Sequence, residues 1–132
     1  MTPFWTAARV AEALGVRVPE GAGPFAAVST DTRAIGKGQL FVALSGEHVD
    51  GHTFLDAARK AGASAAVVRS GTAPMDGLAL IPVDDTLVAL GRLARLRRDA
   101  VPGPVVAVTG TNGKTSTKEM LAQVVRTKWR TH

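Results

Sequence analysis

The sequence of 132 residues contains no cysteine, and aromatic residues make up only 5% of it. The absence of cysteine excludes disulfides and thiolate metal sites, and it fits a reducing compartment. Few aromatic side chains argue against a platform on which nucleic-acid bases stack. Three histidines alone make a weak case for a metal site.

Long hydrophobic runs are also absent. No stretch approaches the length of a membrane span. The first fifteen residues carry Arg9 and Glu12 inside their apolar pattern, which is not typical of a secretory signal. We therefore expect a cytoplasmic protein that does not insert into a membrane.

The net charge of +5 is unevenly distributed. Residues 1–91 contain seven Lys or Arg against nine Asp or Glu, whereas residues 92–132 contain nine against two. Basic surface attracts nucleic-acid phosphates, but the cluster lacks interleaved aromatics and a nucleic-acid-binding motif, so we expect no nucleic-acid partner. The alternative is the solvated face of a helix, formed by Arg92, Arg95, Arg97 and Arg98.

Hydrophobic periodicity predicts alternating strands and helices. Helices are expected at residues 5–14, and at residues 53–61 with Phe54, Leu55, Ala58 and Ala61 on one face. Two further helices are expected, one after Asp84-Asp85 with Leu87, Leu90 and Ala94 buried, and one after Gly113 with Thr117, Met120, Leu121 and Val124 on one face. Strands are expected at residues 25–28, 40–44, 65–68, 80–83 and 105–108. The alternation predicts an α/β fold with a mostly parallel sheet.

We place a domain boundary near Val83, because the segment that follows leads into a second unit. That unit has one predicted strand, which needs neighbours to satisfy its hydrogen bonds. The second unit is therefore expected to be incomplete, and the segment beyond Pro104 is expected to be mobile or to borrow contacts from the first domain or from another copy.

A glycine-rich turn lies between the strand predicted at residues 105–108 and the last helix. Such a turn directs backbone N–H groups and the positive end of a helix dipole at one point, which suits a phosphate. In this interpretation Lys114 reaches the β- and γ-phosphates as the catalytic residue, and the Thr115 hydroxyl coordinates Mg²⁺. The predicted ATP site consists of Gly110, Thr111, Asn112, Gly113, Lys114, Thr115 and Ser116.

The spacing of this loop departs from the common phosphate-loop pattern. Two residues separate Gly110 from Gly113, where the common pattern has four. The preceding apolar strand and the following amphipathic helix supply the expected context. The alternative is an ordinary glycine-rich turn with a surface lysine.

Two polar runs nearer the N-terminus are candidates for substrate binding. Each alone is a weak signal, since such residues commonly hydrogen-bond local backbone in turns. In a functional interpretation, the Arg33 guanidinium binds a diphosphate, and the serine and threonine hydroxyls hydrogen-bond a base or ribose. The candidates are Ser29, Thr30, Asp31, Thr32 and Arg33, together with Asp50, Gly51 and His52.

The order and spacing of these runs resemble the Mur ligases over nearly the whole chain. The resemblance is carried by Ser29-Thr30-Asp31-Thr32-Arg33, Gly38-Gln39-Leu40-Phe41-Val42-Ala43-Leu44, Gly46-Glu47, Asp50-Gly51-His52-Thr53-Phe54, Ala58, Gly62-Ala63 and residues 109–120. The family's short phosphate-loop pattern, Gly-x-x-Gly-Lys-Thr, matches Gly110 to Thr115 directly.

The resemblance implies a UDP-substrate-binding domain at residues 1–83 and the start of a central ATP-binding domain at residues 84–132. It implies an ATP-dependent ligase of peptidoglycan synthesis, in which ATP phosphorylates the carboxylate of a UDP-linked peptide and an amine attacks the acyl phosphate. ATP and Mg²⁺ are the implied cofactors, and the full-length enzyme is expected to be a monomer.

Within the family, Lys118-Glu119-Met120 and the Thr-Asp-Thr-Arg run favour the member that adds D-alanyl-D-alanine to UDP-N-acetylmuramoyl-tripeptide. The alternatives are the member that adds the third amino acid and a non-catalytic nucleotide-sugar-binding module. The family's later motifs, an Asn-rich motif, metal-binding Glu and His and a modified lysine, do not lie in this chain. We therefore expect the 132-residue chain alone to be inactive.

Overall fold

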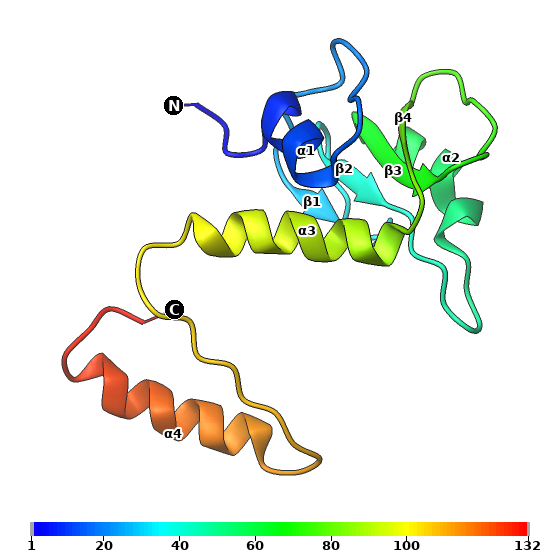
Figure 1. The fold of residues 1–132 in the computed structure, drawn as a ribbon. Helices are drawn as coiled ribbons and strands as arrows, with labels where there is room; N and C mark the ends of the chain where they lie inside the picture. Colours follow the sequence, from blue (N-terminus) through cyan, green and yellow to red (C-terminus); the bar gives the residue numbers. More distant parts are fainter. Residues whose placement is uncertain (1, 132) are drawn as a thin grey trace. The chain divides into compact units, whose positions relative to one another are not determined.

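The computed structural model describes residues 2–131 and divides them into two compact units (Figure 1). The first unit ends at Val101 and the second begins at Pro102. Each is described by itself. Among the described residues, no helix combines the length and apolar character needed to cross a membrane.

The first unit is built on a parallel sheet of four strands, β1 (Val28–Ser29), β2 (Leu40–Val42), β3 (Ala65–Arg69) and β4 (Ala79–Val83). The strands lie in sequence order, and each neighbouring pair is parallel. The register pairs Leu40 with Ala65 and Val67 with Ile81. The predicted α/β class with a parallel sheet is confirmed. The bounds predicted for the first two strands are wrong, because β1 shares only Val28 with the predicted residues 25–28 and β2 ends at Val42 instead of residue 44.

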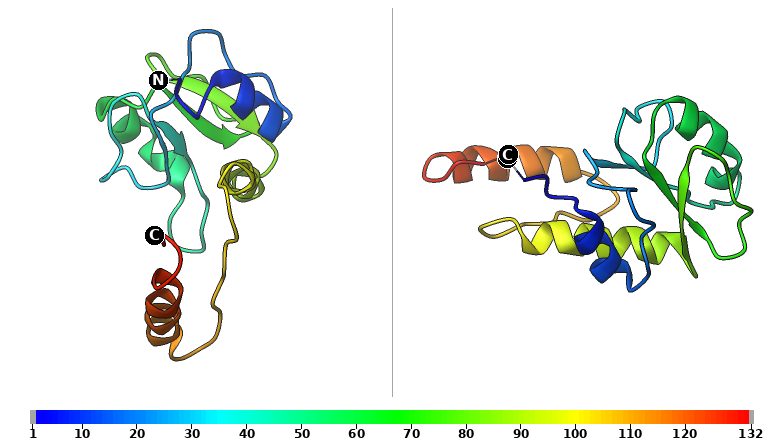
Figure 2. Two further views of the ribbon diagram at one scale, coloured as in Figure 1. Left: turned by 90° about the vertical axis from the view of Figure 1, so that its left-hand side faces the viewer. Right: turned by 90° about the horizontal axis from the view of Figure 1, so that it is seen from above.

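The sheet is buried on both faces, as expected for parallel strands connected by helices. Successive residues of β2 point to opposite faces, so Leu40 and Val42 join one hydrophobic cluster and Phe41 joins the other. The first cluster includes α1 (Ala7–Leu14) and α3 (Thr86–Asp99), and the second includes α2 (Leu55–Lys60). Figure 2 shows these layers from two further directions.

Helix α1 has local signals at both ends. The Thr6 side chain accepts a hydrogen bond from the Arg9 backbone N–H, and Gly15 ends the helix with a φ of 68°. Val10 and Leu14 are buried, as their spacing predicts. The predicted helix is confirmed, although it begins at Ala7.

Helix α3 begins after Asp85, whose carboxylate accepts from the backbone N–H groups of Leu87 and Val88. The predicted buried stripe of Leu87, Leu90 and Ala94 is wrong. Leu87 is 67% exposed and Ala94 is exposed, whereas the buried residues are Thr86, Ala89 and Leu93. Packing against α1 and β3 decides which face of α3 is buried. Leu90 is only partly buried and packs against the first hydrophobic cluster.

Helix α3 belongs to the first unit. The Arg92 guanidinium donates to the Leu14 backbone oxygen at 3.1 Å, and the Arg97 guanidinium lies 4.6 Å from the centre of the Phe4 ring. The division between the compact units therefore falls after Val101 and not near Val83. Two of the four clustered arginines, Arg92 and Arg97, therefore make contacts within the first unit.

The segment predicted as one helix at residues 53–61 consists of a 3₁₀ turn, η1 (Gly51–Phe54), followed by α2. Leu55 and Ala58 are buried, as predicted. Phe54 is 42% exposed and Ala61 is exposed, which contradicts the expected apolar face. Phe54 lies in the 3₁₀ turn, where the α-helical spacing does not hold.

The second unit contains α4 (Lys114–Arg126). The strand predicted at residues 105–108 is not formed, because residues 104–110 have no strand beside them within this unit. None of the described residues from 102 to 131 is buried, and Met120 and Val124 are each 68% exposed. The apolar residues predicted on one face of this helix therefore remain open to solvent.

We expect a sharp difference in backbone protection between the two units. In the 132-residue chain, the backbone amides of β2 and β3 should exchange slowest, and those of residues 104–131 should exchange fastest. Only the strand amides combine hydrogen bonds within the sheet with burial. Hydrogen exchange read by mass spectrometry measures this. Equal protection of residues 105–108 and β3 would contradict it.

Candidate functional site

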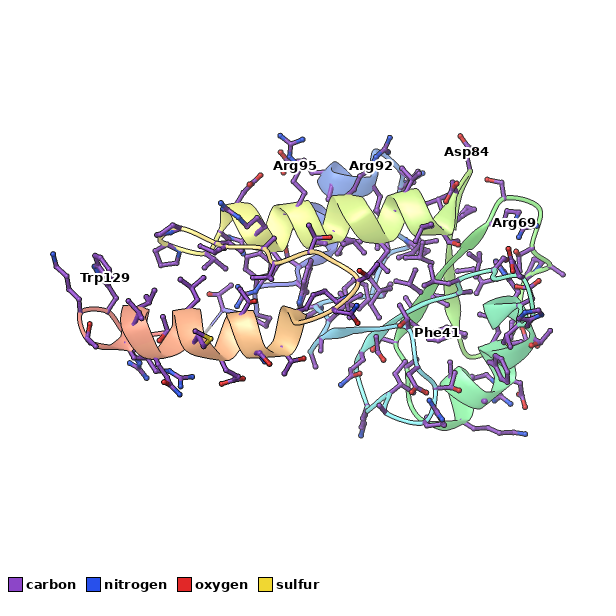
Figure 3. The ribbon with its side chains drawn as sticks, turned by 90° about the horizontal axis from the view of Figure 1, so that it is seen from below. Phe41, Arg69, Asp84, Arg92, Arg95 and Trp129 are labelled. Atoms are coloured by element: carbon purple, nitrogen blue, oxygen red, sulfur yellow. The ribbon has the colours of Figure 1, made fainter. Side chains whose placement is uncertain are left out.

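The carboxyl ends of the four parallel strands meet at one edge of the sheet, where ligands commonly bind in open α/β folds. Ser29 ends β1, Ser45 follows β2, Arg69 ends β3 and Asp84 follows β4. Figure 3 labels Arg69 and Asp84 at this edge. The chain therefore presents several polar side chains at one end of the first unit.

The turn after β1 is held by its own hydrogen bonds. The Asp31 carboxylate accepts from the Arg33 backbone N–H at 2.9 Å and from its guanidinium Nε at 3.0 Å and Nη2 at 2.8 Å. The Ser29 hydroxyl donates to the Asp31 backbone oxygen and accepts from its N–H, both at 3.2 Å. The predicted run therefore forms a structured turn, while the Arg33 side chain remains 88% exposed.

The ion pair of this turn has a measurable electrostatic signature. The side chain and backbone N–H groups of Arg33 lower the pKa of Asp31 to about 2. Because the pKa is lower in the folded state, this carboxylate stabilises the turn at pH values above its ordinary value of 3.8. That contribution is lost as the pH falls from 3.8 towards 2.

We expect Arg33→Gln to return the pKa of Asp31 towards 3.8, because the largest cause of the shift is the Arg33 side chain. A carboxyl-detected NMR titration measures both values. Asp50 is the internal control, since its pKa is also lowered to about 2 but by His52 and Ser45. If the midpoint of Asp31 stayed near 2 in the variant, the ion pair would not be its cause.

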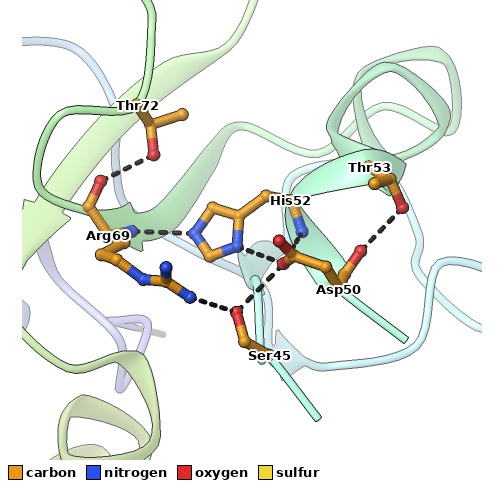
Figure 4. Close-up of polar contacts among 6 residues, drawn as sticks. All are labelled: Ser45, Asp50, His52, Thr53, Arg69 and Thr72. Carbon is orange, nitrogen blue, oxygen red and sulfur yellow. Dashed lines mark hydrogen bonds and ion pairs between the residues drawn. The ribbon is translucent and has the colours of Figure 1, made fainter. Parts of the chain in front are cut away.

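The second predicted run lies in a closed set of hydrogen bonds with two residues that the sequence did not single out, Ser45 and Arg69 (Figure 4). His52 Nδ1 lies 2.6 Å from Asp50 Oδ1, and the Arg69 backbone N–H donates to His52 Nε2 at 2.9 Å. The Ser45 hydroxyl donates to Asp50 Oδ1 at 3.0 Å and accepts from Arg69 Nη2 at 2.6 Å.

Gly51 has a separate steric role in this run. A Cβ at this position would lie 2.7 Å from both the backbone nitrogen and the oxygen of Leu44. The Gly51 N–H also donates to the Leu44 oxygen at 2.7 Å. The glycine therefore allows the chain to pass against the end of β2, and it leaves no side chain to meet a ligand.

A cleft of about 260 Å³ opens at the sheet edge, between the end of β3 and the start of α3. Ser45 and Arg69 were missed because each is a single polar residue after an apolar run. The rule that parallel strands end at one edge could have found them. The residues that line the cleft are Ser45, Arg69, Asp84, Asp85, Thr86 and Leu87.

The glycine-rich loop of the second unit leads directly into α4. Gly110 has a φ of 145° and Gly113 a φ of 76°, conformations that side-chain-bearing residues rarely adopt. The first helical hydrogen bond runs from the Thr117 N–H to the Gly113 oxygen at 2.9 Å. The amides of Lys114, Thr115 and Ser116 therefore have no partner within the helix.

The loop has the space and donors that a phosphate requires. No heavy atom lies within 4 Å of a Cβ built on Gly113, and no side chain caps the helix. The free amides and the exposed Lys114 side chain fit an anion at this helix start. Thr115, which the sequence predicts as a Mg²⁺ ligand, lies exposed in the first turn of α4. Within residues 2–131 no group of three or more histidine or acidic residues could hold a metal ion.

The first unit is a parallel α/β unit with polar strand ends, and the second unit has a glycine-rich loop at a helix start. The chain belongs to the Mur ligase family. The family described as "Mur ligase family, catalytic domain" matches residues 24–98. The "Mur ligase middle domain" matches residues 108–132. The first match ends before the division after Val101, and the second begins after it.

Among curated relatives, the chain is similar to UDP-N-acetylmuramoyl-tripeptide--D-alanyl-D-alanine ligases. It is 45% identical to that of Bacillus subtilis over 80% of this chain and 23% of the relative. It is 49% identical to that of Escherichia coli over 75% of this chain and 22% of the relative. The chain thus spans less than a quarter of these relatives' length.

Solved structures with a similar fold include MurF from Acinetobacter baumannii, with a TM-score of 0.79 and 34% identity over 94% of this chain and 28% of that one. MurF ligase from Thermotoga maritima in complex with ADP has a TM-score of 0.65 and 35% identity, over 76% of this chain and 23% of that one. These likenesses agree with the family assignment.

Proposed function

We propose that the chain is the front part of an ATP-dependent ligase that joins D-alanyl-D-alanine to UDP-N-acetylmuramoyl-tripeptide in peptidoglycan precursor synthesis. The observation that carries the proposal is the 45% and 49% identity to ligases of that name. The occurrence of both family regions in the expected order supports it. The ligation itself is proposed for the complete gene product.

In this proposal the first unit binds the UDP part of the peptide substrate at the carboxyl edge of its sheet. The exposed Arg33 guanidinium meets the diphosphate, because its outer N–H groups remain open to solvent while Asp31 fixes its position. The neighbouring Ser29, Thr30 and Thr32 supply hydroxyl groups for the base or ribose. The structured turn supports this role by reducing the entropy lost on binding.

The second unit is proposed to bind ATP. The amides at the start of α4 and the Lys114 ammonium hold the phosphates, so that the γ-phosphate is positioned for transfer to the peptide carboxylate. The complex of the Thermotoga maritima relative with ADP supports this role. The Thr115 hydroxyl would hold Mg²⁺, which would neutralise phosphate charge when bound. Transfer of the γ-phosphate releases ADP, and the amine of D-alanyl-D-alanine then attacks the acyl phosphate, which forms the peptide bond and releases phosphate.

We expect Arg33→Ala to weaken binding of the UDP-linked tripeptide about ten- to hundredfold, since a charge-assisted contact contributes about 1.5–3 kcal/mol. Isothermal titration calorimetry measures the affinity. Arg17→Ala is the matched control, because Arg17 is exposed and lies in another loop. Unchanged affinity in a folded Arg33 variant would mean that the run is only a structural turn.

A second candidate is the ligase that adds the third amino acid. It is favoured by relatives named UDP-N-acetylmuramoyl-L-alanyl-D-glutamate--2,6-diaminopimelate ligase, such as that of Geobacter sulfurreducens, which is 40% identical over 72% of this chain and 19% of the relative. The lower identity makes this the weaker proposal.

The two candidates are separated by ADP release from the complete gene product. We expect release with UDP-N-acetylmuramoyl-tripeptide and D-alanyl-D-alanine. Release that depends instead on 2,6-diaminopimelate and the UDP-linked dipeptide would support the second candidate. No coupling to either pair would overturn both.

A further inference from the structure

The hydrogen bonds around His52 form a ring that begins and ends at Arg69 (Figure 4). The Arg69 backbone N–H can only donate, so His52 Nε2 must be the acceptor and the ring proton must lie on Nδ1, facing Asp50. The Arg69 guanidinium can also only donate, so the Ser45 hydroxyl proton points to Asp50. Every proton in the ring is therefore determined by its partners.

Both nitrogens of His52 are used inside the protein. The His52 side chain is only 14% exposed, although Asp50 beside it is 49% exposed. A substrate group could hydrogen-bond to the imidazole only by displacing Asp50 or the Arg69 amide. Neither imidazole nitrogen is therefore free to hydrogen-bond a ligand.

We infer that His52 is a positioning residue, which fastens the loop of residues 45–50 (the Ser45–Asp50 loop) to the end of β3 so that the loop can take part in binding the UDP moiety. The inference rests on the proposed function for its ligand. It replaces the sequence-based expectation that His52 itself touches UDP.

The Ser45–Asp50 loop needs such an attachment. It is closed on itself by the Gly46 N–H donating to the Val49 oxygen at 2.8 Å and by a bridge between Ser45 and Asp50. Its residues are all exposed, and Val49 is 57% exposed, so hydrophobic packing does not hold it. The bond from Arg69 to His52 links the loop's end to a strand whose first four residues are buried.

Arg69 ties the loop to the strand a second time, through its side chain and Ser45. Both ties converge on one oxygen, Asp50 Oδ1, which accepts from Ser45 Oγ, His52 Nδ1 and the His52 backbone N–H. Loss of the imidazole therefore removes one of the two ties between the loop and β3, and it also removes one of the donors that orient Asp50. Ser45 also lines the cleft, which connects the ring to the proposed site.

The test uses two variants that each preserve half of the imidazole's role. His52→Asn keeps a donor near the position of Nδ1, and His52→Gln keeps an acceptor near the position of Nε2. We expect each to weaken binding of UDP by about tenfold, measured by calorimetry on the full 132-residue chain. Thr72→Val is the matched control, since it removes a 2.6 Å bond to the Arg69 backbone oxygen outside the ring.

A double-mutant cycle with Ser45→Ala separates positioning from direct contact. If both residues act through the same loop, the losses in UDP affinity should be strongly non-additive. Additive losses, or unchanged affinity in both His52 variants with wild-type unfolding midpoints in urea, would overturn the inference. Urea unfolding also identifies a variant that fails to fold. In that case the UDP affinity of the other His52 variant tests the inference.

Long-range ¹H–¹⁵N NMR of the imidazole tests the ring without any ligand. We expect the proton on Nδ1 and slow exchange of the Arg69 amide in the wild type, with fast exchange of that amide in His52→Asn. A proton on Nε2 would overturn the inference. If the ring is present but the wild-type chain does not bind UDP, the proposed ligand fails. The positioning role would then be withdrawn as well, because it has no other ligand.

Discussion

Ligation by the complete gene product should fall about 10²–10³-fold when Lys114 is replaced by alanine, because removal of one positioned transition-state charge costs about 3–4 kcal/mol. Lys114 is the first residue of α4 and directly follows Gly113, whose φ of 76° turns the chain into the helix. Its side chain is exposed, and none of the ion pairs found in residues 2–131 includes it. The substitution should therefore affect chemistry more than folding.

Lys118→Ala provides the matched control for this prediction. Lys118 lies one helical turn further along α4, is 63% exposed and pairs with Glu119 at 3.0 Å. Its loss removes an equal charge from the same helix without touching the glycine-rich loop. Steady-state kinetics with ATP, the UDP-linked tripeptide and D-alanyl-D-alanine measures both variants. Near-wild-type turnover of Lys114→Ala, or equal losses in the two variants, would contradict the assignment.

Replacing Phe41 by alanine should lower the free energy of unfolding of the first unit by about 3–5 kcal/mol. Phe41 is 1% exposed in the middle of β2, and it packs in the cluster that contains Leu55, Ala58 and Val68. Several members of this cluster are alanines, which are too small to fill the space that the ring would leave. The cavity cost should therefore add to the lost transfer free energy.

Phe54→Ala removes the same ring from a position that is 42% exposed, and its expected cost is below about 1 kcal/mol. Urea unfolding followed by circular dichroism measures the two variants together with the wild type. Similar midpoints for Phe41→Ala and Phe54→Ala would show that the packing around β2 is not as described. The comparison also checks the register of β2, since a shift by one residue would exchange its faces.

The candidate site was predicted from the sequence in part. The sequence pointed to the Ser29–Arg33 run, the Asp50–His52 run and the glycine-rich loop, because short polar runs at strand ends and glycines before a helix have recognisable patterns. The roles within the second run could not be predicted. The hydrogen bonds of Arg69 with His52 and with Ser45 join residues that lie 17 and 24 positions apart, and no local pattern encodes them.

The sequence by itself determined the α/β class, the strands β2 to β4, the start of α3 at Asp85 and the end of α1 at Gly15. These features depend on local hydrophobic runs, caps and glycine conformations. Only the tertiary structure decided that Thr86, Ala89 and Leu93 form the buried face of α3, and that residues 105–108 do not form a strand. Which helix face is buried, and whether an extended segment becomes a strand, depends on neighbours distant in the chain.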